Sequence, residues 1–403
     1  MSTCFRVLAA ASVLAAAATD ASAQRARIPT QQSLKALGLE RMFLARAQID
    51  SGRDATALLS GDEEVVFLVS KSGVVTAFDA ESGRRMWTQL AGGRTENVSA
   101  VVTDIDAAYV VIGERLYAFD KLSGSSLWSL RIPFIPVAAP VFDEERMYVG
   151  TLDGSVYAFE LATVREYAAI GDEKLNQFLQ ETIAWRYRVG GHITSAPVIS
   201  DDALCFTSDN GSLFSLKAES RDEYFQYETD RSVSAPLVAD DGLLFMAGLD
   251  ASLYAIDIQT GQTRWEFVSG RSIRNPAIVI AGHVYLTPTR DGLYRIDRDS
   301  GVKEWQAPTV TQFLAASDDR VYARDTAGSL EVIDGTSGDL VGQLPLRGFS
   351  VGLQNEKTDR IYVATPDGVL MAMREIGREF ATFHNRPKLK PILPPLADAS
   401  GEN

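Results

Sequence analysis

The sequence predicts an all-β fold, an eight-bladed β-propeller with four antiparallel strands in each blade. A hairpin phrase, in which apolar residues alternate around a tight turn, recurs eight times along the 403 residues. Most copies lie about 40 residues apart, a repeat length typical of propellers, whose blades bury their faces against one another. One strand residue of each copy aligns as Phe67, Tyr109, Tyr148, Cys205, Phe245, Tyr285, Tyr322 and Tyr362.

The hairpin phrase is clearest at residues 147–159, MYVGTLDGSVYAF. Apolar residues alternate on both sides of Asp153 and Gly154, a dipeptide that suits a turn with positive φ angles. The phrase therefore predicts the second and third strands of the third blade. A short Pro-containing run before each of several hairpins, such as AAPVF at 138–142, predicts the first strand.

A second phrase, Ala-x-Asp-x-x-x-Gly-x-x-x-Trp, follows several hairpins. We expect its Asp to hydrogen-bond the backbone of the next turn, and its Trp to wedge between neighbouring blades as a large apolar anchor. The predicted blade-docking residues are Asp79, Gly83, Trp87, Asp120, Gly124, Trp128, Asp257, Gly261, Trp265, Asp297, Gly301 and Trp305.

The last hairpin, ending at residues 371–373, has no convincing fourth strand after it. The alternating run RMFLARAQI at 41–49 precedes the first repeat and has no blade of its own. We expect it to complete the eighth blade and so to remove an open sheet edge. The propeller then spans residues 41–376, with an N-terminal extension at 24–40 and a Pro-rich flexible tail at 377–403.

Residues 1–23 are predicted to be a cleaved signal peptide. An apolar core at 7–18 is followed by Ala21, Ser22 and Ala23, a small-x-small cleavage site before Gln24. The core is shorter than the ~20 apolar residues that a membrane span needs. We therefore expect a periplasmic protein that has no transmembrane span. Gln24 stands where a lipid-modified protein would have Cys, so no lipid anchor is expected.

The composition argues against several kinds of site. There are 39 Lys and Arg against 53 Asp and Glu, a net charge of −14 that should repel nucleic acid. His192, His283 and His384 have no partner at a metal-ligand spacing. Cys4 leaves with the signal, so Cys205 can form no intramolecular disulfide. We expect no catalytic site, no metal and no cofactor.

The second phrase, met in full at residues 77–87, 118–128 and 255–265, resembles the tryptophan-docking motif of pyrroloquinoline-quinone-type (PQQ-like) propellers. The resemblance covers about residues 40–376. This superfamily includes the quinoprotein alcohol dehydrogenases and the BamB family, whose members serve the outer-membrane protein assembly machinery. The dehydrogenases are longer, bind a calcium or lanthanide ion and usually contain a vicinal disulfide. This chain has no adjacent Cys pair and no assignable set of ion ligands.

The resemblance is therefore greatest to the BamB family, which has eight blades of similar length and a signal sequence. It implies a non-enzymatic periplasmic scaffold that assists the assembly and insertion of β-barrel proteins into the outer membrane, with protein partners in the cell envelope. The alternative is a propeller that holds quinone or another anionic ligand. The chain departs from the family in lacking the lipidation Cys that anchors many members. It also has His192 and Val233 in the loops where the resemblance implies Arg and acidic side chains that grip the barrel-assembly subunit.

The segments that join one blade to the next are expected to converge on one face, where they form a basic collar. In the six connecting segments that supply the collar, only Glu96 and Asp230 are acidic. Arg suits bidentate contacts with carboxylates, so the collar could receive an acidic surface or an anionic ligand. Otherwise its members are solvated loop charges. The collar comprises Arg94, Arg131, Arg188, His192, Arg231, Arg271, Arg274 and Arg347.

The third repeat carries about 17 extra residues within 161–185, predicted to be helical at about 163–182. Leu175, Phe178, Leu179 and Ile183 are spaced as one face of a helix that Asp172 could cap. This helix is either a docking element for a partner, through Leu175, Phe178 and Leu179, or a cover on the rim. Deletion of residues 168–182 is expected to spare folding.

Overall fold

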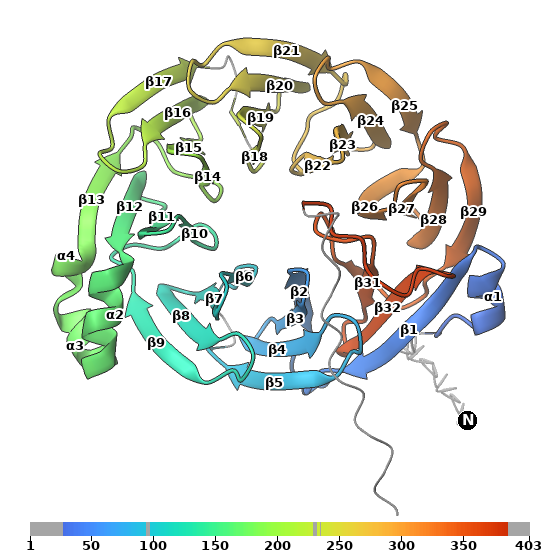
Figure 1. The fold of residues 1–403 in the computed structure, drawn as a ribbon, viewed down its shortest axis with the longest axis horizontal. Helices are drawn as coiled ribbons and strands as arrows, with labels where there is room; N and C mark the ends of the chain where they lie inside the picture. The colour runs from blue at the N-terminus through green and yellow to red at the C-terminus, as the bar shows by residue number, and fades with distance from the viewer. Residues whose placement is uncertain (1–26, 94–96, 229–231, 234, 386–403) are drawn as a thin grey trace, which may run out of the picture.

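Eight four-stranded antiparallel sheets surround a central axis, which confirms the predicted eight-bladed propeller (Figure 1). The structure, a computed structural model, describes residues 27–93, 97–228, 232, 233 and 235–385. The predicted signal peptide and most of the predicted tail lie outside these residues. In each blade the first strand lies next to the axis and the fourth on the outside.

The blades follow one another along the chain. Blade 1 contains β2 (Thr56–Gly61), β3 (Val65–Ser70), β4 (Val74–Asp79) and β5 (Arg85–Leu90). Blade 2 contains β6 (Val102–Thr103), β7 (Ala107–Ile112), β8 (Arg115–Asp120) and β9 (Ser126–Arg131). Blade 3 contains β10 (Val141–Phe142), β11 (Arg146–Gly150), β12 (Ser155–Glu160) and β13 (Ile183–Arg188). Blade 4 contains β14 (Val198–Ser200), β15 (Ala203–Thr207), β16 (Ser212–Lys217) and β17 (Glu223–Glu228).

The second half of the ring continues the pattern. Blade 5 contains β18 (Val238–Asp240), β19 (Leu243–Ala247), β20 (Ser252–Asp257) and β21 (Thr263–Val268). Blade 6 contains β22 (Ile278–Ile280), β23 (His283–Leu286), β24 (Leu293–Asp297) and β25 (Lys303–Ala307). Blade 7 contains β26 (Val310–Ala316), β27 (Arg320–Asp325), β28 (Ser329–Asp334) and β29 (Leu340–Pro345). Blade 8 contains β30 (Val351–Gly352), β31 (Ile361–Ala364), β32 (Val369–Glu375) and β1 (Leu39–Arg46).

The core lies between the blades. Every residue of β3, β7 and β15 is buried, because a second strand is covered by a neighbouring blade on both of its faces. The outer strands alternate instead, as in β17, where exposed and half-buried residues follow one another. Hydrophobic clusters accordingly join residues of adjacent blades, such as Phe67 of blade 1 with Val110 of blade 2.

Trp and Gly of the second phrase lock neighbouring blades together. The indole N–H of Trp87 donates to the carbonyl of Lys121 in blade 2 at 2.8 Å. Its ring lies on Gly124, where an added Cβ would come within 2.4 Å of Trp87 Cγ. Trp265 and Gly301 repeat this contact between blades 5 and 6.

The Asp of the phrase binds the backbone of the following turn. Asp79 accepts from the backbone N–H and the hydroxyl of Ser82 at 2.8 and 2.6 Å, and Asp297 does the same with Ser300 at 2.8 and 2.5 Å. These bonds hold the tight turn that presents the glycine to the preceding blade.

The N-terminal strand closes the ring as the sequence predicts. Strand β1 pairs with β32 in antiparallel register, with Leu39 opposite Glu375 and Arg46 opposite Val369. Phe43 of β1 takes the place of the missing tryptophan, since a Cβ on Gly83 of blade 1 would lie 2.2 Å from its ring. Blade 8 therefore docks on blade 1 through the same aromatic-on-glycine contact that joins other blades.

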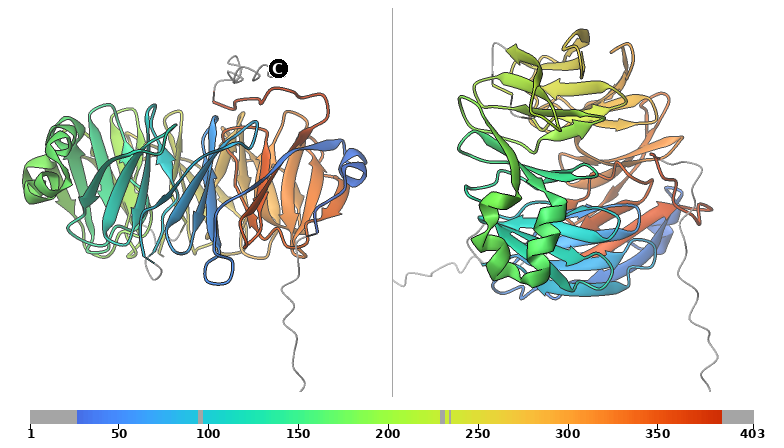
Figure 2. Two further views of the ribbon diagram at one scale, coloured as in Figure 1. Left: turned by 90° about the horizontal axis from the view of Figure 1, so that it is seen from below. Right: turned by 60° about the vertical axis from the view of Figure 1, so that its left-hand side comes forward.

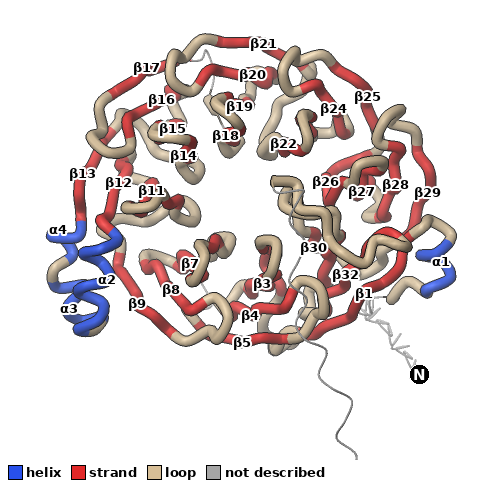
Figure 3. The backbone as a smooth tube through the Cα atoms, in the orientation of Figure 1, coloured by secondary structure: helices blue, strands red, loops and turns tan. Residues whose placement is uncertain are grey.

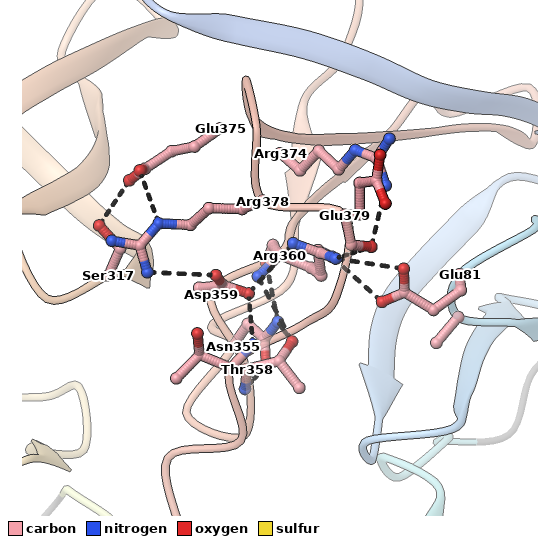
Figure 4. Close-up of polar contacts among 12 residues, drawn as sticks. Glu81, Ser317, Asn355, Thr358, Asp359, Arg360, Arg374, Glu375, Arg378 and Glu379 are labelled. Atoms are coloured by element: carbon pink, nitrogen blue, oxygen red, sulfur yellow. Dashed lines mark hydrogen bonds and ion pairs between the residues drawn. The ribbon is translucent and has the colours of Figure 1, made fainter. Parts of the chain in front are cut away.

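A buried ion-pair network reinforces this closure (Figure 4). Arg360 of blade 8 is fully buried, and its Nε and Nη2 contact the two carboxylate oxygens of Glu81 in blade 1 at 3.1 and 3.2 Å. Nη2 also donates to the carbonyl of Glu379 at 3.1 Å, and Nη1 lies 3.3 Å from Asp359. One guanidinium thus joins two blades and the segment that follows β32.

The propeller has two faces (Figure 2). We call the connector face the one that carries the segments between blades together with the turns between second and third strands. The opposite face carries the loops between first and second strands. Residues 376–385 cross this opposite face after β32, and His384 donates its backbone N–H to the carbonyl of Lys357 at 2.9 Å.

In the part of the chain that the structure describes, four short helices lie on the rim (Figure 3). Helix α1 (Gln31–Lys35) precedes β1, whereas α2 (Leu161–Ile170), α3 (Asp172–Gln177) and α4 (Leu179–Thr182) lie outside blade 3 between β12 and β13. The expected helical stripe through Ile183 is wrong, because the helix ends at Gln177 and Ile183 begins β13. The capping role of Asp172 is also wrong: Gly171 is the N-cap, and Asp172 instead accepts a hydrogen bond from Ser129 at 2.6 Å.

Candidate functional site

The connector face is built from two kinds of loop that hydrogen-bond to each other. The backbone N–H of Leu152, in the turn of blade 3, donates to the carbonyl of Ile135 in the preceding connector at 3.0 Å. Asp209 and His192 repeat this bond at blade 4 at 2.9 Å, and blade 6 repeats it again. These three connectors are therefore fixed against the turns of the blades that they enter.

The basic residues predicted for this face lie in different settings. Arg131 is exposed and forms an ion pair with Glu114, with Nη2 and Oε2 3.0 Å apart. Arg94 and Arg231 lie outside the described residues. The remaining arginines are exposed and form no ion pair with another described residue: Arg188, Arg271, Arg274 and Arg347.

His192 is held by its backbone and its ring. Its backbone N–H donates to the carboxylate of Asp209 at 2.9 Å, and its ring Nδ1 contacts the carbonyl of Leu152. The residue is exposed, so one edge of the imidazole remains open to solvent. His192 thus joins the turns of blades 3 and 4 on the connector face.

Acidic residues of the hairpin turns share this face. The predicted basic collar takes in the connectors alone, in which Glu96 and Asp230 are the acids. The structure places Glu114, Asp153 and Asp209 of the hairpins beside the connectors. The face therefore carries both signs of charge. Arg271 and Arg274 differ from Arg131 in forming no ion pair with a described acid.

An exposed apolar patch lies on the connector face between blades 2 and 3. It consists of Phe134, Ile135 and Leu152, whose exposed fractions are 44%, 43% and 44%. We call these three residues the apolar patch. Arg131 and Arg188, the last residues of β9 and β13, end on the same face. An aromatic anchor beside arginine is the composition of energetically dominant residues in protein interfaces.

Arg186 packs against the aromatic ring of the apolar patch. Its guanidinium lies 5.7 Å from the ring centre of Phe134 and 5.2 Å from that of Tyr157. Asp153 contacts the same guanidinium at 2.7 Å. Burial raises the pKa of Asp153, but hydrogen bonds from Thr151 and Ser155 and the charge of Arg186 outweigh it and hold that pKa below its ordinary value. The guanidinium is thus fixed by a carboxylate that stays ionised at neutral pH.

A sequence feature other than charge indicates this patch. Phe134 and Ile135 are enclosed by prolines in IPFIP, within a connector expected to be exposed. An aromatic residue in a rigid exposed loop is a stronger indication of binding than a scattered charge. Leu152 could not be placed beside them without the structure, because it belongs to the next hairpin.

The insertion in blade 3 turns its apolar residues toward the propeller. Leu175 is fully buried in the cluster between blades 2 and 3, and Leu179 packs against that cluster. Phe178 stacks on Tyr167 of α2 with ring centres 5.2 Å apart. The three residues considered for docking therefore hold the helices on the blade.

Helix α3 also covers the edge of blade 2. The side chain of Asn176 accepts from the backbone N–H of Arg131 at 2.7 Å and donates to the carbonyl of Ser129 at 2.9 Å. One side chain thus pairs with both polar groups of an outer strand, as a neighbouring strand would. The structure argues against the expectation that residues 168–182 can be deleted without harm.

The described residues contain no group of three or more His, Cys, Asp or Glu placed to hold a metal ion. Cys205 is buried in β15, and burial raises the pKa of its thiol to about 12, so the unreactive thiol form persists at neutral pH. No helix within the described ranges has the length and apolar character to cross a membrane.

The model of the family described as outer membrane protein assembly factor BamB matches residues 71–167, 172–313 and 229–356, more than half of the chain. The chain belongs to the BamB family. A curated BamB, the outer membrane protein assembly factor of Shewanella oneidensis, is 23% identical over 179 residues. The match covers 42% of this chain and 42% of that relative, so the chain spans less than half the length of the curated relative it matches.

Solved structures share the fold. The crystal structure of BamB from Moraxella catarrhalis superposes with a TM-score of 0.63 at 16% identity, covering 84% of this chain and 98% of that one. The computationally designed Ika8 protein superposes with a TM-score of 0.62 at 14% identity, covering 81% and 98%. Because a designed chain matches about as well as a natural BamB, these similarities concern architecture alone.

Proposed function

We propose that this member of the BamB family is a non-enzymatic periplasmic scaffold that assists the assembly and insertion of β-barrel proteins into the outer membrane. Family membership supports a scaffold role, and the name of the Shewanella relative, an outer membrane protein assembly factor, supports the process. The observation that carries the proposal is the apolar patch on the connector face. Exposed aromatic and aliphatic side chains that lie together in fixed loops are typical of surfaces that bind another protein.

The patch supplies the anchor, and the arginines supply orientation. Phe134, Ile135 and Leu152 would lose their water contact against an apolar surface of a subunit of the barrel-assembly machinery. Arg271 and Arg274 are exposed in the connector between blades 5 and 6, where their guanidinium groups could bind carboxylates of that partner.

The location of the protein is part of the proposal. Residues 1–23 would direct export and be cleaved before Gln24, leaving no cysteine for a lipid anchor. Attachment to the outer membrane would then depend on the partner, which makes the connector face responsible for location as well as for function.

The test is affinity purification of the tagged full chain from the envelope of its own bacterium. We expect the central barrel-assembly subunit to co-purify, and mass spectrometry of the isolated protein to give Gln24 as its first residue. The variant Phe134→Ala with Ile135→Ala should lose this subunit, and the variant Arg271→Glu with Arg274→Glu should reduce it.

Matched controls are Leu90→Ala and Val268→Ala, which remove apolar side chains that are 70% and 63% exposed from the outer strands of blades 1 and 5. Retention of the subunit by the patch variant would contradict the proposed contact. A quinone absorbance spectrum after incubation of the chain with pyrroloquinoline quinone and Ca²⁺ would instead show a ligand-binding propeller.

A further inference from the structure

A second candidate site also lies between blades 2 and 3, but on the face opposite the connectors and beside α2. It is a pocket of about 590 Å³. Its floor contains the aromatic residues Tyr109, Trp128 and Phe142, with the rings of Tyr109 and Phe142 4.4 Å apart at their centres. The loops between first and second strands form its rim, so it belongs to the face opposite the connectors. It is thus separate from the proposed scaffold contact.

The pocket exists because blade 3 breaks the repeat. In blades 2, 6 and 7 the Asp-x-x-x-Gly turn brings a glycine onto the tryptophan of the preceding blade, as Gly124 does for Trp87. After β12 the chain instead enters α2 at Leu161. Trp128 therefore has no such turn against it, and Leu161 and α2 form the outer wall of the pocket.

Trp128 has an indole N–H that is not used. The other tryptophans donate to a carbonyl of the following blade at 2.8–3.0 Å, and the pairs are Trp87 with Lys121, Trp185 with Ala218, Trp265 with Arg298 and Trp305 with Gly335. No described residue accepts a hydrogen bond from Trp128, although its side chain is only 5% exposed and lines the pocket. This N–H is not enclosed, because Trp128 lines the pocket, and a ligand carbonyl there could accept its hydrogen bond in place of solvent.

The rim of the pocket is acidic and partly apolar. Four carboxylates line it, those of Asp104, Asp106, Asp143 and Glu144, against one guanidinium, that of Arg165. Asp104 is fixed by Tyr109, whose hydroxyl donates to it at 2.8 Å, and by two backbone N–H groups. The carboxylates of Asp106 and Glu144 bind no other described residue. Ile105, which lies between Asp104 and Asp106 in the sequence, has an exposed fraction of 89%.

From these features we infer that the pocket binds an extended basic peptide segment of a partner protein. A proline or aliphatic side chain would lie on the aromatic floor, and a peptide carbonyl would accept the hydrogen bond of Trp128. Lys or Arg next to it would face the acidic rim. Extended, proline-containing segments suit aromatic-lined grooves because they lose little conformational freedom on binding.

The test uses the full mature chain and a fluorescein-labelled peptide of repeated Lys-Pro-Leu triplets, with Glu-Pro-Leu triplets as the matched control. Fluorescence anisotropy should show binding of the Lys peptide alone. With ¹⁵N-labelled tryptophan the chain has five indole signals. The signal that disappears in Trp128→Phe, which keeps a ring but removes the N–H, should be the one that shifts most on binding.

Two variants separate the contributions of hydrogen bond and charge. Trp128→Phe should weaken binding about five- to tenfold. The variant Asp106→Asn with Glu144→Gln, which removes two carboxylates that support no described contact, should weaken it about three- to tenfold, less so at high salt. Asp201→Asn with Glu219→Gln changes the same charge on the loops of blade 4 and should leave binding unchanged.

Equal affinity of both variants and wild type, or a shift at another tryptophan, would overturn the inference. So would a roughly tenfold gain in affinity when residues 386–403 are removed, because the basic, Pro-rich stretch in them would then be the occupant in place of a partner.

Discussion

Gly124 carries two requirements that no other residue type meets together. Its φ of +72° lies in the left-handed region, and its Cα hydrogen faces the indole of Trp87, with no room for a methyl group. The glycine is thus needed both by its own turn and by the blade before it. Phe43 over Gly83 and Trp305 over Gly338 show the same double use.

This arrangement makes a prediction for Gly124→Ala. The substitution adds left-handed strain and a clash with a packed ring, so we expect the free energy of unfolding to fall by about 2–5 kcal/mol. Gly328→Ala is the control, because that glycine has a φ of +80° with nothing within 4 Å of an added Cβ. It should cost only about 1–2 kcal/mol. Urea titration measures both, and equal losses would show that the ring contact contributes nothing.

At the scale of single elements, the insertion of blade 3 replaces a turn by helices and gives them two tasks. Helix α2 forms the outer wall of the pocket beside Trp128, and α3 covers the edge of β9 through Asn176. Leu175 fixes the helices to the core. A segment that looks like a separate decoration in the sequence is therefore part of the packing between blades 2 and 3.

The covering of β9 can be tested with Asn176→Ala. Loss of its two backbone hydrogen bonds should lower the free energy of unfolding by about 1–2 kcal/mol. Hydrogen exchange should become faster at the amide of Arg131, which donates to Asn176. Gln177→Ala, at the exposed next residue of α3, should change neither quantity. Unchanged exchange at Arg131 in the first variant would show that α3 does not protect the strand.

The sequence allowed the fold to be predicted because each blade repeats the same local chemistry. Asp153 with Gly154 marks a hairpin, and the Asp-Gly-Trp phrase marks the next turn and the blade contact. The unpaired run at 41–49 could be assigned to blade 8 because every other blade was already complete. These inferences need only residues that are close in sequence.

The candidate sites could be predicted less well because they depend on residues brought together by the ring. Leu152 joins Phe134 and Ile135 only through the bond between a connector and the next hairpin. Acids of the hairpins share the face of the arginines for the same reason. The helical spacing of Leu175, Phe178 and Leu179 indicated an apolar face, but spacing does not tell whether that face meets the blade or a partner.

On the scale of the whole molecule, closure depends on one blade made from both ends of the described chain. Blade 8 combines β1 with β30, β31 and β32, and Arg360 joins it to Glu81 of blade 1 (Figure 4). Arg360 also binds the segment that crosses the face opposite the connectors. The same guanidinium therefore stabilises a sheet contact and the path of the chain after it.

The contribution of this ion pair is testable with Arg360→Ala. The change leaves Glu81 and Asp359 without their buried cation, so we expect a loss of about 3–5 kcal/mol in the free energy of unfolding. Arg46→Ala, which removes an exposed ion pair with Asp367 in the same blade, should cost less than about 1 kcal/mol. Thermal unfolding followed by circular dichroism compares the two, and losses of similar size would argue against a special role for the buried pair.

The pairing of β1 with β32 has a consequence for how the molecule is made. Residue 39 leaves the ribosome early, yet its partner is residue 375, so β1 waits unpaired while seven blades are synthesised. Until β32 arrives, β1 has a free edge that is available to any other chain or to a chaperone. A product that stops before blade 8 would keep that edge permanently, and quality control could use it to distinguish such a product from the finished ring.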